Sequence, residues 1–211
     1  MSTRLAAHDP STVALVRVGV AVSGFDDVRQ QHAELMADYR RRIMTIEDIS
    51  GDFQQIVDDD IDALIGEHVA ADELPGRPAI ESLLAAATAF PLTVSVEDLI
   101  GATRTRIRDR LREDATRACR ARSAKVEKLA GPGASGELQR RVIVSCLDRS
   151  WRAHLVTLNE LYEDVTTRVG SLEEKAAEFR VEATAAYRVM WPRVRAESVV
   201  FLFQLDIRSA R

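Results

Sequence analysis

The chain has 211 residues, of which 46% are hydrophobic and 29% are charged, a composition typical of a soluble globular protein. Aromatic residues make up only 5%, while Ala, Leu, Val, Arg and Glu are abundant, so helices packed on helices are favoured over a β-sheet protein. A net charge of -4 excludes a general attraction to nucleic acid or anionic lipid, and any such contact has to be local. We therefore expect an all-α fold.

The two cysteines and the N-terminal apolar run exclude several classes of protein. Cys119 and Cys146 lie far apart and have no CxxC spacing, which argues against a disulfide framework and against a zinc site. The run LVRVGVAV at residues 15–22 is too short to span a bilayer, and no cleavage pattern with a basic leader accompanies it. We expect a cytoplasmic chain, in which residues 1–24 have no assigned role.

The first predicted helix covers residues 25–44. Val28, Leu35, Tyr39 and Ile43 fall on one helical face, which suits an amphipathic helix. The arginine triplet at residues 40–42 complements the helix dipole at the C-terminal end. We interpret that triplet as a solvated helix end in preference to a partner contact.

An acidic segment follows at residues 47–73, with ten carboxylates and no lysine or arginine. Phe53, Ile56 and Ile61 keep helical spacing, so the acidic residues are expected to form the solvent-exposed face of a helix. The cluster DDDID at residues 58–62 resembles a metal site on paper. Successive helical residues turn by about 100 degrees, however, so these carboxylates should fan out and no metal is expected. A turn at ELPGRP and a short helix over residues 79–89 come next.

A further long helix is predicted over residues 97–129. Its part from residue 104 to 128 holds ten Lys or Arg against four acids, a local positive stripe. We favour a solvated face that offsets the preceding acidic helix, and an anionic partner, a lipid surface and nucleic acid remain as alternatives. Nucleic acid is the weakest of them because no aromatic residues are interleaved. GPGASG at residues 131–136 then predicts the clearest break in the chain.

The remaining part, residues 142–207, is predicted to form two long helices joined by a tight turn. Residues at steps of three and four give the first of them an apolar stripe: Val144, Leu147, Trp151, Leu155, Leu158, Tyr162, Val165 and Val169. Gly170 supplies the freedom to reverse the chain. Ser171 and Glu174 have the spacing of a capping box. We predict a helical hairpin with its tip at residues 169–172.

These segments also resemble a known family. LDRSWRAHL at residues 147–155, LYEDVTTR, EFRVEA and ESVVFLFQL, together with FDDVRQQHAELMADYRRRIM at residues 25–44, are similar to the C-terminal scaffold of SecA, the motor of bacterial protein export. The resemblance covers roughly residues 25–207. It implies a long scaffold helix, a helical wing and a C-terminal two-helix hairpin.

The implied division of the chain has four parts. Residues 1–24 are an unassigned extension, and residues 25–45 are the first part of the helical scaffold. The helical wing takes residues 46–137. Residues 138–211 hold the second part of the scaffold with the two-helix finger. In SecA the finger tip sits near the mouth of the membrane channel and contacts the polypeptide being moved.

The resemblance also implies roles for individual residues. The finger tip, where a partner or preprotein would be contacted, corresponds to Arg168, Val169, Gly170, Ser171 and Leu172. The packing motif of the long helix corresponds to Asp148, Trp151, His154 and Leu155, with His154 a hydrogen-bonded partner. Two departures stand out. Gly170 takes the place of a bulky tip residue, which weakens a pushing role, and Pro192 falls inside the second helix, where it removes a backbone hydrogen bond.

No catalytic residues and no cofactor are expected. The chain contains no GxxxxGK[ST], and GPGASG lacks the lysine of a phosphate loop, so it is not expected to be an ATPase in its own right. Cys146 and His154 would lie about 12 Å apart along a straight helix, too far for a nucleophile and its base.

The resemblance implies that the chain acts in preprotein translocation through contacts with other proteins. The expected partners are SecA-type motor domains or a motor subunit, a SecYEG-like channel and the preprotein, with peripheral contact at the inner face of the cell membrane. The alternative is a stand-alone helical adaptor that keeps the scaffold fold but has left export.

Overall fold

The computed structural model describes residues 24–70 and 74–206 of the chain. Within these residues the regular structure is helical and no strand occurs, which confirms the all-α prediction. The helices are α2 (Phe25–Thr45), α3 (Ser50–His68), α4 (Arg77–Ala86), the 3-10 turn η1 (Ala87–Ala89), α5 (Val96–Leu99), α6 (Arg104–Ala130), α7 (Ala134–Thr167) and α8 (Leu172–Gln204). The expected N-terminal extension, apart from Gly24, lies outside the described residues.

The chain divides into two compact units. One, called the hairpin unit below, holds α2 with the parts of α7 and α8 between residues 143 and 194. The other, called the α3–α6 unit, holds residues 48–142 and the end of α8 from residue 195. Neither α7 nor α8, nor any other described helix, is long and apolar enough to cross a bilayer.

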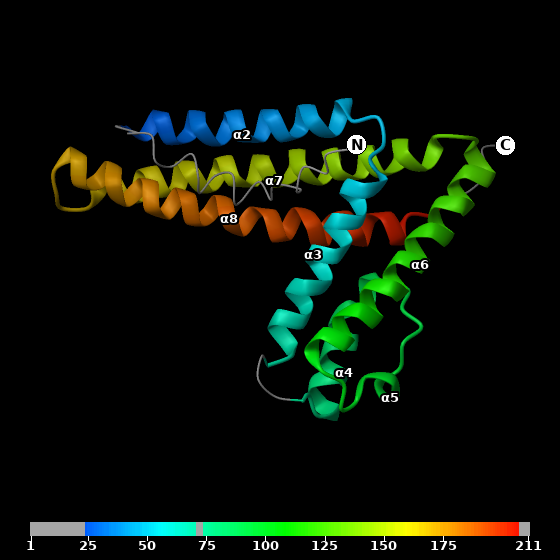
Figure 1. Ribbon diagram of the computed structural model, residues 1–211. Coiled ribbons are helices and arrows are strands. Elements are labelled where there is room, and N and C mark those ends of the chain that lie inside the picture. Colours follow the sequence, from blue (N-terminus) through cyan, green and yellow to red (C-terminus); the bar gives the residue numbers. More distant parts are fainter. Residues whose placement is uncertain (1–23, 71–73, 207–211) are drawn as a thin grey trace, which may run out of the picture. The chain divides into compact units, whose positions relative to one another are not determined.

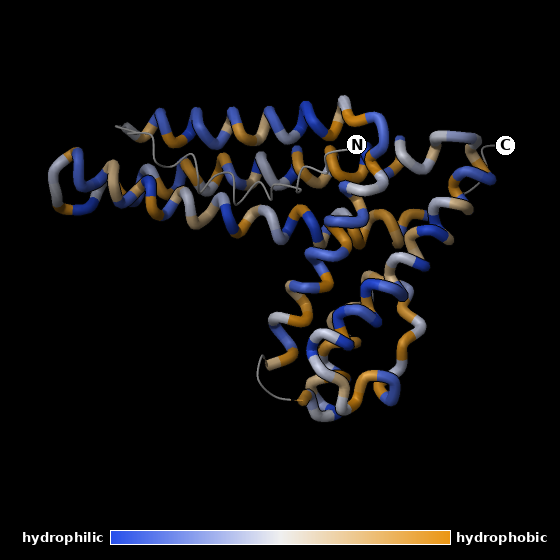
Figure 2. Tube along the Cα trace, in the orientation of Figure 1, coloured by the Kyte–Doolittle hydropathy of each residue, from blue (hydrophilic) through white to orange (hydrophobic). Residues whose placement is uncertain are grey.

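In the hairpin unit, α2 lies along α7 and α8 (Figure 1). Hydrophobic residues recur at regular intervals along all three helices (Figure 2). A buried cluster joins them through Val28 of α2, Leu158 and Val165 of α7, and Phe179 and Ala183 of α8. Each helix therefore contributes an apolar face to one shared core, the usual way in which amphipathic helices gain stability.

The buried line of α7 differs from the predicted stripe. Leu147, His154, Leu158 and Val165 are buried, whereas Leu155 is 39% exposed and Val169 is fully exposed. These buried residues are separated by steps of seven and four, as expected for one face of a helix, but one of them, His154, is polar. A scan for apolar residues alone therefore shifts the stripe onto the neighbouring Leu155, and the predicted burial of that residue is wrong.

The α3–α6 unit is built around α3, which contacts both α4 and α6 (Figure 1). Its core consists mainly of aliphatic side chains that are almost completely buried: Val57, Ile61, Ile65, Ile80, Leu83, Leu99, Ile107 and Leu111. The last turns of α8 belong to the same unit, and Ser198, Val199 and Leu202 are buried there.

The single helix predicted over residues 97–129 is two helices. The short helix α5 opens on a capping box between Ser95 and Asp98. Gly101 then takes φ +70, a left-handed conformation that favours glycine. Thr103 caps α6 by accepting a hydrogen bond from the Arg106 N–H at 3.3 Å. Apolar spacing alone does not reveal this break, because Leu99 and Ile107 on either side of it are both buried.

The acidic run of α3 spreads its carboxylates over separate partners, as the helical turn angle predicted. Asp58 accepts from Gln54 at 2.8 Å and Asp59 from Gln55 at 2.7 Å, one turn back along the helix. Asp62 pairs with Arg108 at 3.1 Å and Arg112 at 2.7 Å, both on α6. The positive stripe of α6 therefore offsets part of the acidic helix before it.

Candidate partner-contact site

The hairpin tip, residues 168–172, connects α7 to α8. Arg168 N–H donates to the Val165 carbonyl at 3.2 Å, and the Lys175 ammonium donates to the Thr166 carbonyl at 2.8 Å. The Thr167 hydroxyl donates to the Asp164 carbonyl at 2.8 Å. These bonds satisfy carbonyls that a helix C-terminus would otherwise leave open, and a cation there also complements the helix dipole. The end of α7 is therefore well fixed.

The capping box predicted at the start of α8 is confirmed. The Glu174 N–H donates to the Ser171 hydroxyl oxygen at 3.2 Å, while the Ser171 N–H donates to a Glu174 carboxylate oxygen at 2.8 Å. The Ser171 hydroxyl also donates to this carboxylate at 2.9 Å, and the bonds from the Ser171 N–H and hydroxyl lower the pKa of the Glu174 carboxyl. Reciprocal bonds of this kind fix the direction in which a chain enters its helix.

Gly170 has a conformation and surroundings that disfavour any side chain. Its φ of +148 is a backbone region that L-residues rarely adopt. A Cβ atom built there would lie 3.2 Å from a carboxylate oxygen of Glu174, the residue that caps α8. The tight reversal of the chain and the adjacent cap therefore explain why a glycine, and not a bulky residue, occupies this position.

Arg168 clamps the two helices of the hairpin together. Its guanidinium contacts Asp164 on α7, Glu178 on α8 at 3.0 Å and Glu182 on α8 at 2.6 Å. Hydrogen bonds to Glu182, then to Asp164 and Glu178, raise the pKa of Arg168 above its ordinary value. This predicted contact residue is thus already engaged within the hairpin, which stiffens the approach to the tip.

Two apolar side chains at the tip are left in solvent. Val169 is fully exposed and Leu172 is 74% exposed. They flank Gly170 and Ser171 on a backbone held by the capping box and the arginine clamp. Exposed apolar groups on a fixed backbone can bind an apolar segment with little loss of conformational entropy. Of the five predicted tip residues, these two present exposed apolar side chains.

The predicted packing motif on α7 lies elsewhere in the hairpin unit. Asp148 pairs with Arg40 of α2 at 3.1 Å, and the ring of Trp151 lies 5.5 Å from that of His154. His154 is buried, and its Nε2 is 3.2 Å from Nδ1 of His32 on α2. The prediction of a hydrogen-bonded His154 is confirmed. Leu155, the fourth member, faces partly outward.

The histidine pair belongs to an aromatic cluster that the sequence did not suggest. The ring of His32 stacks on Tyr187 of α8 with centroids 4.4 Å apart, and Tyr187 meets Trp191 edge-on at 5.8 Å. Burial lowers the pKa of His32 to about 4, with a further contribution from His154, and burial lowers that of His154 to about 4. One polar residue on the otherwise apolar face of α2 was the available signal.

The described residues contain no group of three or more His, Cys, Asp or Glu side chains that could hold a metal ion.

Comparison of the chain with known proteins identifies its family. A family model described as the SecA wing and scaffold domain matches residues 20–206. The chain belongs to the SecA wing and scaffold family. A protein translocase subunit SecA from Saccharopolyspora erythraea is 32% identical over 194 residues, covering 88% of this chain and 20% of that protein. SecA proteins from Rhodococcus opacus and Nocardia farcinica are 28% and 29% identical with similar coverage.

The chain thus spans about a fifth of the length of these SecA relatives. The matched region contains every helix from α2 to α8 and so draws on both compact units.

Proposed function

We propose that this chain is the scaffold and wing part of a SecA-type protein translocase and acts in preprotein export through protein contacts. Its support is membership of the SecA wing and scaffold family over residues 20–206 and its similarity to proteins named as translocase subunits. A part that carries contacts and no chemistry suits a chain without the glycine-rich loop and lysine that phosphoryl transfer from ATP requires. On this proposal, nucleotide hydrolysis belongs to separate motor domains.

The proposal includes a division of labour along the chain. Residues 25–45 and 138–211 form the scaffold with the two-helix finger, residues 46–137 form the wing, and residues 1–24 are an extension of unassigned role. Partners would be SecA-type motor domains or a motor subunit and a SecYEG-like channel. The working place would be the cytoplasmic side, at the inner face of the cell membrane.

The observation that carries the proposal is the fixed apolar tip of the hairpin. Val169 and Leu172 are held in solvent at the end of two long helices, and Arg168 ties those helices together through Glu178 and Glu182. A rigid support transmits position to a contact surface better than a flexible loop does. Two short apolar side chains suit transient contact with varied apolar segments, such as those of an unfolded preprotein.

Site-specific photo-crosslinking tests this proposal. A photoreactive residue at Val169 should yield adducts with the channel, a motor subunit or a translocating preprotein. The matched control is Val181, which is 70% exposed on the body of α8. Adducts at Val169 that are absent at Val181 support the finger role.

Two other outcomes overturn it. Adducts at Val169 only with unrelated soluble proteins would favour the stand-alone adaptor. Absence of adducts at Val169, with abundant ones along residues 104–128, would move the contact surface to α6.

A further inference from the structure

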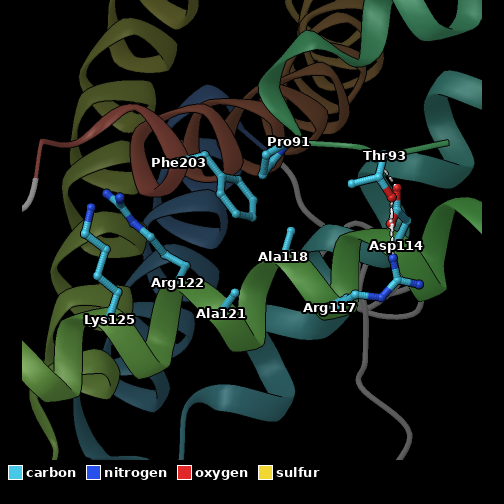
Figure 3. A pocket seen from close by; sticks show the side chains of 9 residues that line it. All are labelled: Pro91, Thr93, Asp114, Arg117, Ala118, Ala121, Arg122, Lys125 and Phe203. Carbon is cyan, nitrogen blue, oxygen red and sulfur yellow. Dashed lines mark hydrogen bonds and ion pairs between the residues drawn. The ribbon is translucent and has the colours of Figure 1, made fainter. Parts of the chain in front are cut away.

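The α3–α6 unit contains an open cleft of about 480 Å³. It lies between the extended segment that follows Phe90, the middle of α6 and the last turns of α8 (Figure 3). Its apolar lining comes from Pro91, Ala118, Ala121 and Phe203. The two alanines come from one face of α6, and their small side chains would let the backbone of a bound molecule approach the helix closely.

The segment that forms one wall of the cleft is held by a buried carboxylate. Asp114 accepts from the Thr93 N–H at 2.5 Å, the Thr93 hydroxyl at 2.8 Å and the Val94 N–H at 3.1 Å. Arg117 also contacts Asp114, at 2.5 Å. Burial alone would raise the pKa of Asp114, but these bonds from Thr93 and Val94 hold it below its usual value. The wall is therefore fixed, and the charge of Arg117 is compensated.

The other end of the cleft carries two cations, Arg122 and Lys125, for which no ion pair with a carboxylate is found among the described residues. Arg122 donates to the Leu205 carbonyl, its Nε is buried without a partner, and Lys125 lies one turn further along α6. Both side chains extend from α6 in the same direction (Figure 3). Burial lowers the pKa of Arg122, and only part of this effect is offset by the charge of Asp206. This end of the cleft carries net positive charge.

We propose that this cleft binds a short segment of a partner protein in which apolar side chains are followed by acidic ones. The apolar residues would lie over Ala118 and Ala121 against Phe203, and a carboxylate would reach Lys125 and Arg122. The volume is in the range of known ligand pockets. A free amphiphile of similar chemistry is disfavoured because an open cleft leaves much of a small ligand in water, whereas a protein segment continues beyond it.

A fluorescein-labelled peptide, Ala-Leu-Phe-Glu-Glu-Ala, serves as the probe, and fluorescence anisotropy with the purified chain is the readout. Saturable binding that weakens in high salt is expected, because exposed charge pairs are screened. The counterpart with glutamine in place of both glutamates should bind more weakly. K125Q should reduce affinity by about fivefold, near the upper limit for one exposed ion pair. A121L should also reduce affinity, because the larger side chain fills the floor of the cleft.

The matched control is K128Q, on an exposed position of α6 outside the cleft. It should leave the affinity unchanged, and thermal unfolding of each variant reports whether the fold is kept. K125Q and K128Q both change exposed positions, so their comparison stands even if A121L fails to fold.

Four outcomes overturn the proposal. The first is absence of saturable binding, and the second is equal affinity for the glutamine and glutamate peptides. The third is an equal loss of affinity in K125Q and K128Q. The fourth is displacement of the peptide by decanoate that binds as tightly as the peptide does. The last would assign the cleft to a free amphiphile. Because the assay uses the chain alone, its failure leaves the finger role untouched, and failure of the finger role leaves this result standing.

Discussion

Acid should destabilise the hairpin unit through its buried histidine pair. His32 and His154 are hydrogen-bonded to each other between α2 and α7, and burial lowers the pKa of each to about 4. In the unfolded chain both should titrate near 6.5. Between these values the unfolded state binds more protons than the folded state, so stability falls as pH falls. The contribution of the uncharged histidine pair to folding stability is therefore fully present above pH 6.5 and is lost by about pH 4.

The magnitude follows from the difference between the two pKa values. A change from 6.5 to about 4 corresponds to about 3 kcal/mol for each histidine. The two rings share one hydrogen bond and His154 acts on His32, so the sites are coupled and the combined loss applies to the pair. We expect the free energy of unfolding to fall by several kcal/mol across this window.

Urea unfolding followed by tryptophan fluorescence is a suitable assay. The chain has two tryptophans, Trp151 and Trp191, and both belong to the hairpin unit, so the signal reports on the part that holds the histidines. The variant with His32→Gln and His154→Gln should lose most of the pH dependence between 7.5 and 5. An equal slope in the wild type and the variant would refute the reasoning.

Asp60, in the α3–α6 unit, should act in the opposite direction. Burial raises the pKa of its carboxyl to about 6, with a smaller opposing effect from Arg195. The folded state then binds more protons than the unfolded state between pH 3.8 and about 6, so stability rises as pH falls through this range. A D60N variant removes this contribution and serves as the control for the acid series.

Three further predictions concern stability and nucleotide. Gly170→Ala should lower the free energy of unfolding by about 1 kcal/mol or more because of its positive φ, and a neutral result in urea unfolding would mean that the tip relaxes. Trp191→Ala should cost roughly 3–5 kcal/mol and Trp151→Ala clearly less, since Trp191 is 2% exposed and Trp151 only half-buried; equal losses would contradict the burial pattern. ATP at millimolar concentration should neither be hydrolysed nor raise the melting temperature, and a reproducible upward shift would point to a nucleotide site.

The turn and the helix cap of the hairpin could be predicted from the sequence because each depends on a few neighbouring residues. Ser171 and Glu174 predicted the cap, and Gly170 predicted the reversal. Apolar spacing likewise predicted the first helix from residue 25, whereas it carried the first hairpin helix to Val169, two residues beyond its observed end at Thr167. The family resemblance likewise rested on separated motifs in fixed order.

The core of the same hairpin was harder to predict because it uses polar side chains. His154 and Ser150 occupy buried positions of α7, so apolar spacing placed the core line on Leu155 instead. His32 stacks on Tyr187, a residue far away in sequence, and no local pattern predicts that partner. The cleft beside Phe203 also depends on residues from three separate segments. Tertiary pairing decided each of these features.

The most direct test of the translocase assignment is the identity of the chain's partners in its own cells. The tagged chain, expressed at its natural level and cross-linked before lysis, should co-purify with a SecYEG-like channel or with a SecA-type motor subunit. The R168E variant, which replaces attraction to Glu178 and Glu182 with repulsion, should reduce the channel adducts by loosening the tip. Recovery of unrelated soluble proteins, with neither channel nor motor subunit present, would contradict the assignment.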